Sequence, residues 1–147
     1  MEAWAQKRLL ECGSAIYEPL QPEQRVKWPA HLLAFCMRRS PSVPAIAHVA
    51  ALARVPADWR LAHAAFSDVR KVTLVAERRD EAFEPCLKSL LYVAENTAKV
   101  IYNASNASAL FDHDAGWWMV PCFKHFLATV AEPEVTDAGV RLLFASD

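Results

Sequence analysis

The stretch that decides the fold runs from Glu84 to Val130 and reads EPCLKSLLYVAENTAKVIYNASNASALFDHDAGWWMVPCFKHFLATV. Its first half carries apolar or small residues at i, i+4, i+7, i+11, i+14 and i+18, namely Leu87, Leu91, Ala94, Ala98, Ile101 and Ser105. These positions share one face of an α-helix, so the pattern predicts a helix of about five turns over residues 85–107. A second helix is predicted over 117–130, with Pro121 in its first turn.

The rest of the chain shows further helical patterns separated mainly by proline. We predict helices over residues 2–17, 22–39, 44–54 and 56–79, with a boundary or kink at Trp28-Pro29 and a last helix capped by Thr136-Asp137. The β-branched run VTLVA at 72–76 is assigned to a helix, because one isolated strand would lack a pairing partner. Glycine is scarce, at 3 of 147 residues, which disfavours tight β-hairpins. We therefore predict an all-α, single-domain bundle of six or seven helices spanning residues 1–147.

Composition and charge exclude several classes of partner. The formal net charge is −1, which gives no electrostatic reason to expect nucleic acid or an anionic membrane as partner. The opening residues MEAWAQKRLLECG carry charge where a signal peptide has an apolar core, and no apolar run reaches the ~18 residues of a membrane span. A cytoplasmic protein is expected. Its four cysteines form no CxxC pair, so we expect reduced thiols and predict neither a metal site nor a cofactor.

The first candidate site is the polar flank of the 85–107 helix. Glu95, Lys99, Tyr102 and Asn103 lie at i, i+4, i+7 and i+8, and these positions stack along one side of a helix. Together they present a carboxylate, an ammonium, a phenol and an amide, which suits a small polar ligand. The alternative is a solvated face on which Glu95 and Lys99 form an ordinary i,i+4 ion pair.

The second candidate is the polar turn between the two helices. Asp112, His113 and Asp114 lie in it. Cys122 and His125 follow about one helix turn apart on the next helix, from which His125 is able to reach back towards the turn. Aspartate and histidine are ligands of zinc and iron, but no paired-ligand motif such as HExxH is present. The simpler interpretation is that Asp112 or Asp114 caps the helix that follows.

Trp117 and Trp118 are the strongest indication of a partner in the sequence. Adjacent residues on a helix diverge by about 100°, so the two indoles cannot both face the same core. One of them is expected at a surface, a groove or a subunit interface, where tryptophan is enriched.

Two functional hypotheses follow. The first is a non-catalytic binding or interaction protein that self-associates, for example as a homodimer, through the surface around Trp117, Trp118 and the 95–103 flank. The second is a small enzyme or ligand-binding protein with a polar pocket between the 85–107 and 117–130 helices. The residues expected to line that pocket are Glu95, Lys99, Tyr102, Asn103, Asp112 and His113.

Overall fold

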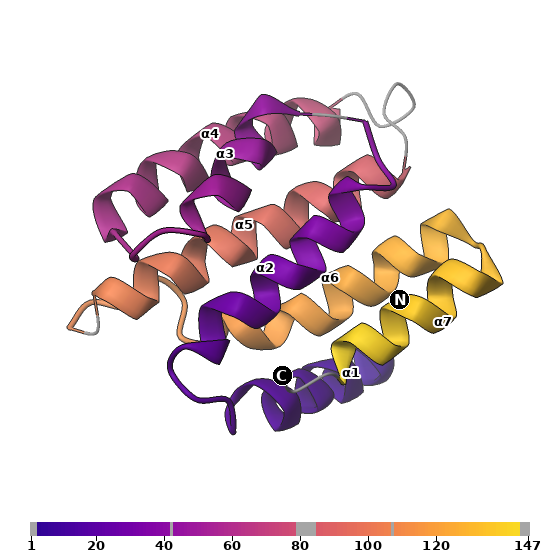
Figure 1. The fold of residues 1–147 in the computed structure, drawn as a ribbon. Helices are drawn as coiled ribbons and strands as arrows, with labels where there is room; N and C mark the ends of the chain where they lie inside the picture. The colour runs from indigo at the N-terminus through magenta and orange to yellow at the C-terminus, as the bar shows by residue number, and fades with distance from the viewer. Residues whose placement is uncertain (1–2, 42, 79–84, 107, 145–147) are drawn as a thin grey trace.

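The computed structural model describes residues 3–41, 43–78, 85–106 and 108–144. Within these ranges lie seven helices (Figure 1): α1 (Ala3–Tyr17), α2 (Gln24–Met37), α3 (Pro44–Leu52), α4 (Trp59–Arg78), α5 (Pro85–Ser105), α6 (Ala115–Val130) and α7 (Pro133–Leu143). Helix packs on helix throughout the described chain. The predicted all-α bundle is confirmed.

Helix α5 is the central element of the bundle. It contacts α2, α3, α4 and α6. The middle of its predicted stripe is buried, with Leu91, Ala94 and Ala98 fully covered and Ile101 nearly so, while Leu87 and Ser105 at its ends are half-buried. A helix of this length, ringed by four others, buries its stripe against several neighbours at once, and this burial is the main stabilising contribution expected for the fold.

Figure 1 shows the other helices arranged around α5. Helices α3 and α4 lie on one side of it, α6 lies on the other, and α1 and α7 flank α6 on the side away from α4. Helices α5 and α6 follow each other in the chain and run antiparallel. Among the described helices, none has both the length and the apolar character needed to cross a bilayer.

Two glycines let α1 approach α6 closely. A Cβ atom added at Gly13 would lie 2.1 Å from the backbone oxygen of Trp117. Pro121 lies four residues after Trp117 inside α6 and has no N–H, so that oxygen lacks its helical donor. On the facing surface, a Cβ atom at Gly116 would lie 2.5 Å from ring atoms of Tyr17. Glycine at both positions is therefore required for this packing.

Several predicted helix boundaries are wrong, and three of them involve a proline. Helix α2 continues through Pro29, so no boundary occurs there, and the alternative of a kink stays a prediction. Helix α6 begins at Ala115, two residues earlier than predicted, which places Pro121 in the helix interior. Helix α7 begins at Pro133, and its N-cap residue is Glu132 rather than Thr136 or Asp137. In each case a proline marks a helical N-terminus or is tolerated inside a helix that tertiary contacts hold together.

The β-branched run at 72–76 is helical, as predicted, and lies in α4. Thr73 and Ala76 are buried on the face of α4 that packs against α5. The Thr73 hydroxyl donates a hydrogen bond to the Val69 carbonyl at 3.0 Å, which satisfies the hydroxyl within the helix.

Candidate functional site

A pocket of about 480 Å³ lies between α5 and α6. Its α5 wall consists of Ser89, Tyr92, Glu95, Asn96 and Lys99, and its α6 wall of Trp118, Pro121, Cys122 and His125. Asp112, from the connecting loop, completes the lining. Both walls follow helical spacing, so the two antiparallel helices present a polar and aromatic face to each other along this groove.

Glu95 is the least exposed ionisable residue of the pocket. Only 6% of its surface is exposed, although it is a carboxylate. Its Oε1 accepts a hydrogen bond from Arg70 Nη1 at 3.4 Å. Its Oε2 is buried and receives no hydrogen bond from any residue that the structure describes. The nearby Thr73 hydroxyl donates to the Val69 carbonyl at 3.0 Å and also lies close enough to Glu95 to lower the pKa of its carboxyl.

Burial raises the pKa of the Glu95 carboxyl above its ordinary value. The neighbouring Thr73 hydroxyl and the charges of Arg70 and Lys99 act in the opposite direction, while Glu77 adds to the increase in the pKa. A buried acceptor without a donor lowers stability by about 1–3 kcal/mol. Such an arrangement is typical of a functional position, where an atom is held ready for a ligand.

The charges around Glu95 form a short network across three segments. Arg70 on α4 lies between Glu95, at 3.4 Å, and Glu77, at 3.7 Å. Lys99 donates to Asp112 Oδ2 at 2.7 Å and so ties α5 to the loop before α6. The i,i+4 pair expected between Glu95 and Lys99 is replaced by these tertiary partners. The 95–99 side of α5 is therefore a packed surface.

Tyr92 and Cys122 contribute neutral groups to the pocket. The Tyr92 hydroxyl donates to Glu77 Oε1 at 2.8 Å, and burial together with this bond raises the Tyr92 pKa to about 12. Burial likewise raises the pKa of the Cys122 thiol to about 12. Both groups are protonated at neutral pH, so neither is a ready nucleophile.

A second polar contact closes the far end of the pocket. The Ser89 hydroxyl lies 2.5 Å from Nδ1 of His125 and joins α5 to α6. Asn96 adds a further link, because its Nδ2 donates to the Tyr92 carbonyl at 3.0 Å and lies 3.7 Å from the Cys122 sulfur. These bonds fix the positions of the polar groups along the groove.

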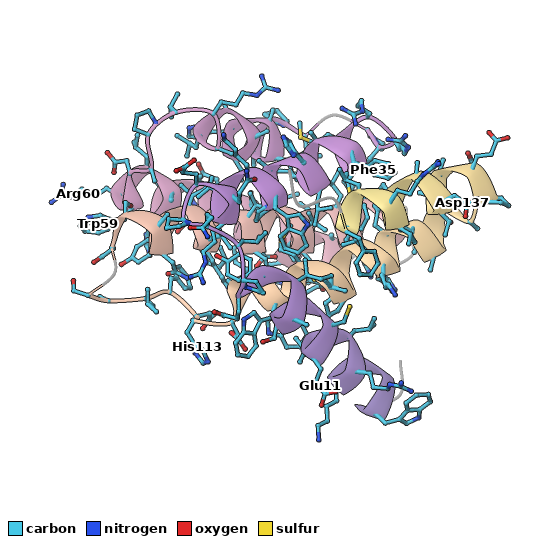
Figure 2. The ribbon with its side chains drawn as sticks, turned by 60° about the horizontal axis from the view of Figure 1, so that its bottom comes forward. Glu11, Phe35, Trp59, Arg60, His113 and Asp137 are labelled. Atoms are coloured by element: carbon cyan, nitrogen blue, oxygen red, sulfur yellow. The ribbon has the colours of Figure 1, made fainter. Side chains whose placement is uncertain are left out.

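Four of the eight residues predicted at the site line the pocket: Glu95, Lys99, Asp112 and Trp118. The structure directs the other four elsewhere. Tyr102 packs among aromatic rings, with Trp59 at 5.7 Å and Phe111 at 5.6 Å between centroids. His113 projects outward from the loop before α6 (Figure 2). Trp117 faces α1, where its indole N–H donates to Glu18 Oε1 at 2.6 Å.

Asn103 holds the loop that carries Asp112. Its Nδ2 donates to the carbonyls of Phe111 and Asp112, each at 3.1 Å, and its Oδ1 accepts the Phe111 N–H at 2.6 Å. Asp112 has a φ of 55°, a conformation that few residues other than glycine adopt and that aspartate tolerates better than most. Asn103 therefore positions the loop at one end of the pocket.

Replacing Asn103 with alanine is expected to release this loop. The change removes three hydrogen bonds to the loop backbone, so we expect the free energy of unfolding to fall by about 2 kcal/mol. Urea denaturation measures the loss, and faster amide exchange at Phe111 reports loop opening. The matched control is Asn106→Ala, which removes two bonds between side chains, one to the Tyr102 hydroxyl and one from the Ser108 hydroxyl, and is expected to have a smaller effect. Equal effects of the two substitutions would contradict the role of Asn103.

The predicted capping of α6 by an aspartate side chain is wrong. Asp114 is the N-cap residue, but its side chain makes no capping hydrogen bond. Its Oδ2 instead accepts the Trp118 indole N–H at 3.2 Å. Asp112 is bound to Lys99. Both carboxylates thus serve side chains at the pocket, where partner groups compete with the helix terminus for them.

Sequence reasoning placed Cys122 and His125 beside the turn that carries Asp112, but it did not group them with Ser89, Tyr92, Asn96 and Pro121 as members of one site. The sequence did contain a pattern that could have indicated this site. Residues at helical spacing share one face of each helix, namely Ser89, Tyr92, Asn96 and Lys99 on α5 and Trp118, Cys122 and His125 on α6. Matching these faces requires knowing that the two helices pair in antiparallel register. In the part of the chain that the structure describes, no three histidine, cysteine or acidic side chains are grouped to hold a metal ion. No protein-family model, curated protein or solved structure matches this chain.

Proposed function

We propose that this protein binds a small molecule in the pocket between α5 and α6. The observation that carries the proposal is the Glu95 carboxylate, which lines a pocket of about 480 Å³ and whose buried Oε2 receives no donor from the described residues. Small-molecule sites have volumes of roughly 300–1,000 Å³ and combine apolar walls with a few placed polar groups. This pocket has that size and that composition.

Ligand binding would explain why the chain keeps a buried carboxylate at position 95 although burying it lowers stability. An apolar residue at position 95 would fill the same space without desolvating a carboxylate. Stability is expected to favour that replacement, so the retained carboxylate supports a role in recognition. Tyr92 and Cys122 are both protonated at neutral pH, so neither supplies an activated nucleophile, and this favours binding over covalent chemistry.

Trp118 is expected to form the aromatic wall against which a ligand packs. A fragment screen read by ligand-observed NMR should give hits whose signals change on binding, and Trp118→Ala should weaken them by about tenfold, since an aromatic contact of this kind contributes about 1 kcal/mol or more. Trp4→Ala is the matched control, because Trp4 is 63% exposed on α1 and lies outside the pocket. We expect it to leave every hit unchanged.

Two results would overturn the proposal. One is a screen in which no fragment binds the wild-type protein at millimolar concentration. The other is a set of hits that bind Trp118→Ala and wild type equally, which would place the binding surface elsewhere on the chain.

The hypothesis of a protein-interaction surface at the tryptophan pair has less support. Both indoles are half-buried within the chain, and both indole N–H groups have acceptors in it, Glu18 for Trp117 and Asp114 for Trp118. The two indoles do point to different sides of α6, as helix geometry requires: Trp117 contacts the α1 side and Trp118 lines the pocket. Neither position needs a second chain to cover it. Self-association stays a prediction, which sedimentation velocity tests directly.

A further inference from the structure

We infer that the occupant of the α5–α6 pocket is a small organic monocation, an ammonium group attached to an apolar or aromatic body. This inference rests on the proposed function and adds the chemical class of the ligand. It is carried by three independent features of the pocket: its hydrogen-bonding groups, its charge and its aromatic walls.

The hydrogen-bonding groups require a ligand that donates. The principal donors of the lining each have an acceptor within the chain: Asp112 for Lys99 Nζ, Glu77 for the Tyr92 hydroxyl, the Tyr92 carbonyl for Asn96 Nδ2, and Asp114 for the Trp118 indole. The buried polar atom left without a partner is an acceptor, Glu95 Oε2. A ligand that offers only carbonyl or carboxylate oxygens would leave the Glu95 carboxylate without a further donor and would repel it. An ammonium N–H satisfies it.

The charge of the pocket favours one positive unit. Asp112 is balanced by Lys99, at 2.7 Å. Arg70 is shared by two carboxylates, Glu77 and Glu95. His125 apart, these described ion pairs therefore set two cations against three carboxylates and leave one negative charge uncompensated. That charge is best assigned to Glu95, whose second oxygen lacks a partner. A bound monocation would neutralise it beside a carboxylate that is itself 6% exposed, where screening is weaker than at the open surface.

The walls of the pocket suit an organic cation better than a hydrated metal ion. Trp118 and Tyr92 both line the pocket. Their polar atoms are occupied by Asp114 and Glu77, so the surfaces left for a ligand are those of the rings. Aromatic faces attract ammonium groups and also bury the apolar part of a ligand. A metal ion would need several oxygen or nitrogen ligands, and no such group occurs among the described side chains.

Three shape-matched probes test the inference: benzylamine, benzyl alcohol and benzoate, each titrated into the full-length protein and followed by amide NMR shifts at the pocket. We expect benzylamine to bind about tenfold more tightly than benzyl alcohol, because a charge-assisted bond replaces a neutral one. Benzoate should bind most weakly. Glu95→Gln, which keeps the shape of the side chain, should reduce benzylamine binding to the level of benzyl alcohol.

The control is Glu11→Gln, which removes the same charge from an exposed position on α1 (Figure 2). It should leave the benzylamine preference intact, and a loss there would indicate a general effect of net charge and overturn the inference. Equal binding of benzylamine and benzyl alcohol to wild type would also overturn it, while leaving the pocket as a binding site. Absence of binding by all three probes would contradict both the inference and the proposed function. The wild-type comparison is decisive even if Glu95→Gln folds poorly.

Discussion

Replacing Gly13 with alanine is expected to lower the free energy of unfolding by about 3 kcal/mol, the upper end of the usual cost of overpacking. The new Cβ atom would lie 2.1 Å from the Trp117 backbone oxygen and 2.9 Å from its carbonyl carbon. Backbone atoms of two packed helices cannot rotate away as a side chain does. Relief therefore requires α1 to move off α6 as a unit.

The sign of this effect is informative. Alanine in a helix is favoured over glycine by about 1 kcal/mol. Replacing a helical glycine that has no packing role by alanine therefore makes the protein more stable. A large loss of stability on Gly13→Ala would therefore mean that the clash between α1 and α6 outweighs the gain in helix propensity. Moving α1 would also strain the Glu18–Trp117 bond and the packing of Tyr17 over Gly116. Urea denaturation followed by far-UV circular dichroism, carried out on wild type and Gly13→Ala, gives the difference in free energy of unfolding.

Gly139→Ala is the matched control for this prediction. Its Cβ atom would meet the two δ-methyl carbons of Leu127, at 2.6 and 2.8 Å, and these can shift by side-chain rotation. We expect the propensity gain and the contact to offset each other, with a net change within about 1 kcal/mol. If Gly13→Ala proves as stable as Gly139→Ala, the close approach of α1 to α6 is not as described.

The sequence predicted the α5 spine because its evidence is local. A stripe such as Leu87, Leu91, Ala94 and Ala98 specifies both the helix and its buried face, and the structure bears this out. Gly13 shows the opposite case. It interrupts an apolar pattern in its own helix. Glycine is needed there because the Trp117 carbonyl of α6, which Pro121 leaves without a helical donor, lies against it. No local pattern relates residues 13 and 117.

The candidate site divides in the same way. The 95–103 flank could be recognised as a polar helix face, but the partners that give it meaning come from other segments: Arg70 from α4 and Asp112 from the loop. Tyr102 and Asn103 belong to the same flank by spacing, yet lie one turn beyond the pocket and serve the loop and the aromatic cluster. Spacing in the sequence predicts the side of a helix on which a residue lies. It does not predict which residue of another segment will face it.

The second large effect is expected at Glu95. Glu95→Met should raise the free energy of unfolding at pH 7 by about 1 kcal/mol and abolish the ammonium preference of the pocket. Methionine matches the length of glutamate, fills the same space and leaves no buried acceptor. Removing one member of a buried ion pair usually destabilises a protein, because the other charge is stranded. Arg70, however, is 41% exposed and keeps Glu77 at 3.7 Å.

The pH dependence supplies an independent check. The pKa of Glu95 is raised in the folded state, by burial first, against the opposing effects of Thr73, Arg70 and Lys99 and with a further increase from Glu77. Cys122 on α6 and Tyr92 on α5 face the same carboxyl and stay protonated at neutral pH. Between the ordinary carboxyl pKa of 4.5 and the raised value, the folded state binds more protons than the unfolded chain. Glu95 therefore contributes stability at low pH that is lost as the pH rises through its folded-state pKa.

The stability advantage of Glu95→Met over wild type should thus be largest at neutral pH and shrink as the pH falls towards 4.5. Urea denaturation of both proteins at a series of pH values measures the difference, in which titrations common to the two proteins cancel. Glu77→Met is the control: Glu77 is exposed, and its loss breaks the Tyr92 bond, so no gain is expected. A Glu95→Met protein that is less stable than wild type at pH 7 would show that the carboxylate supports the fold. A more stable variant that no longer distinguishes benzylamine from benzyl alcohol would assign the carboxylate to ligand recognition, because folding alone would then favour its replacement.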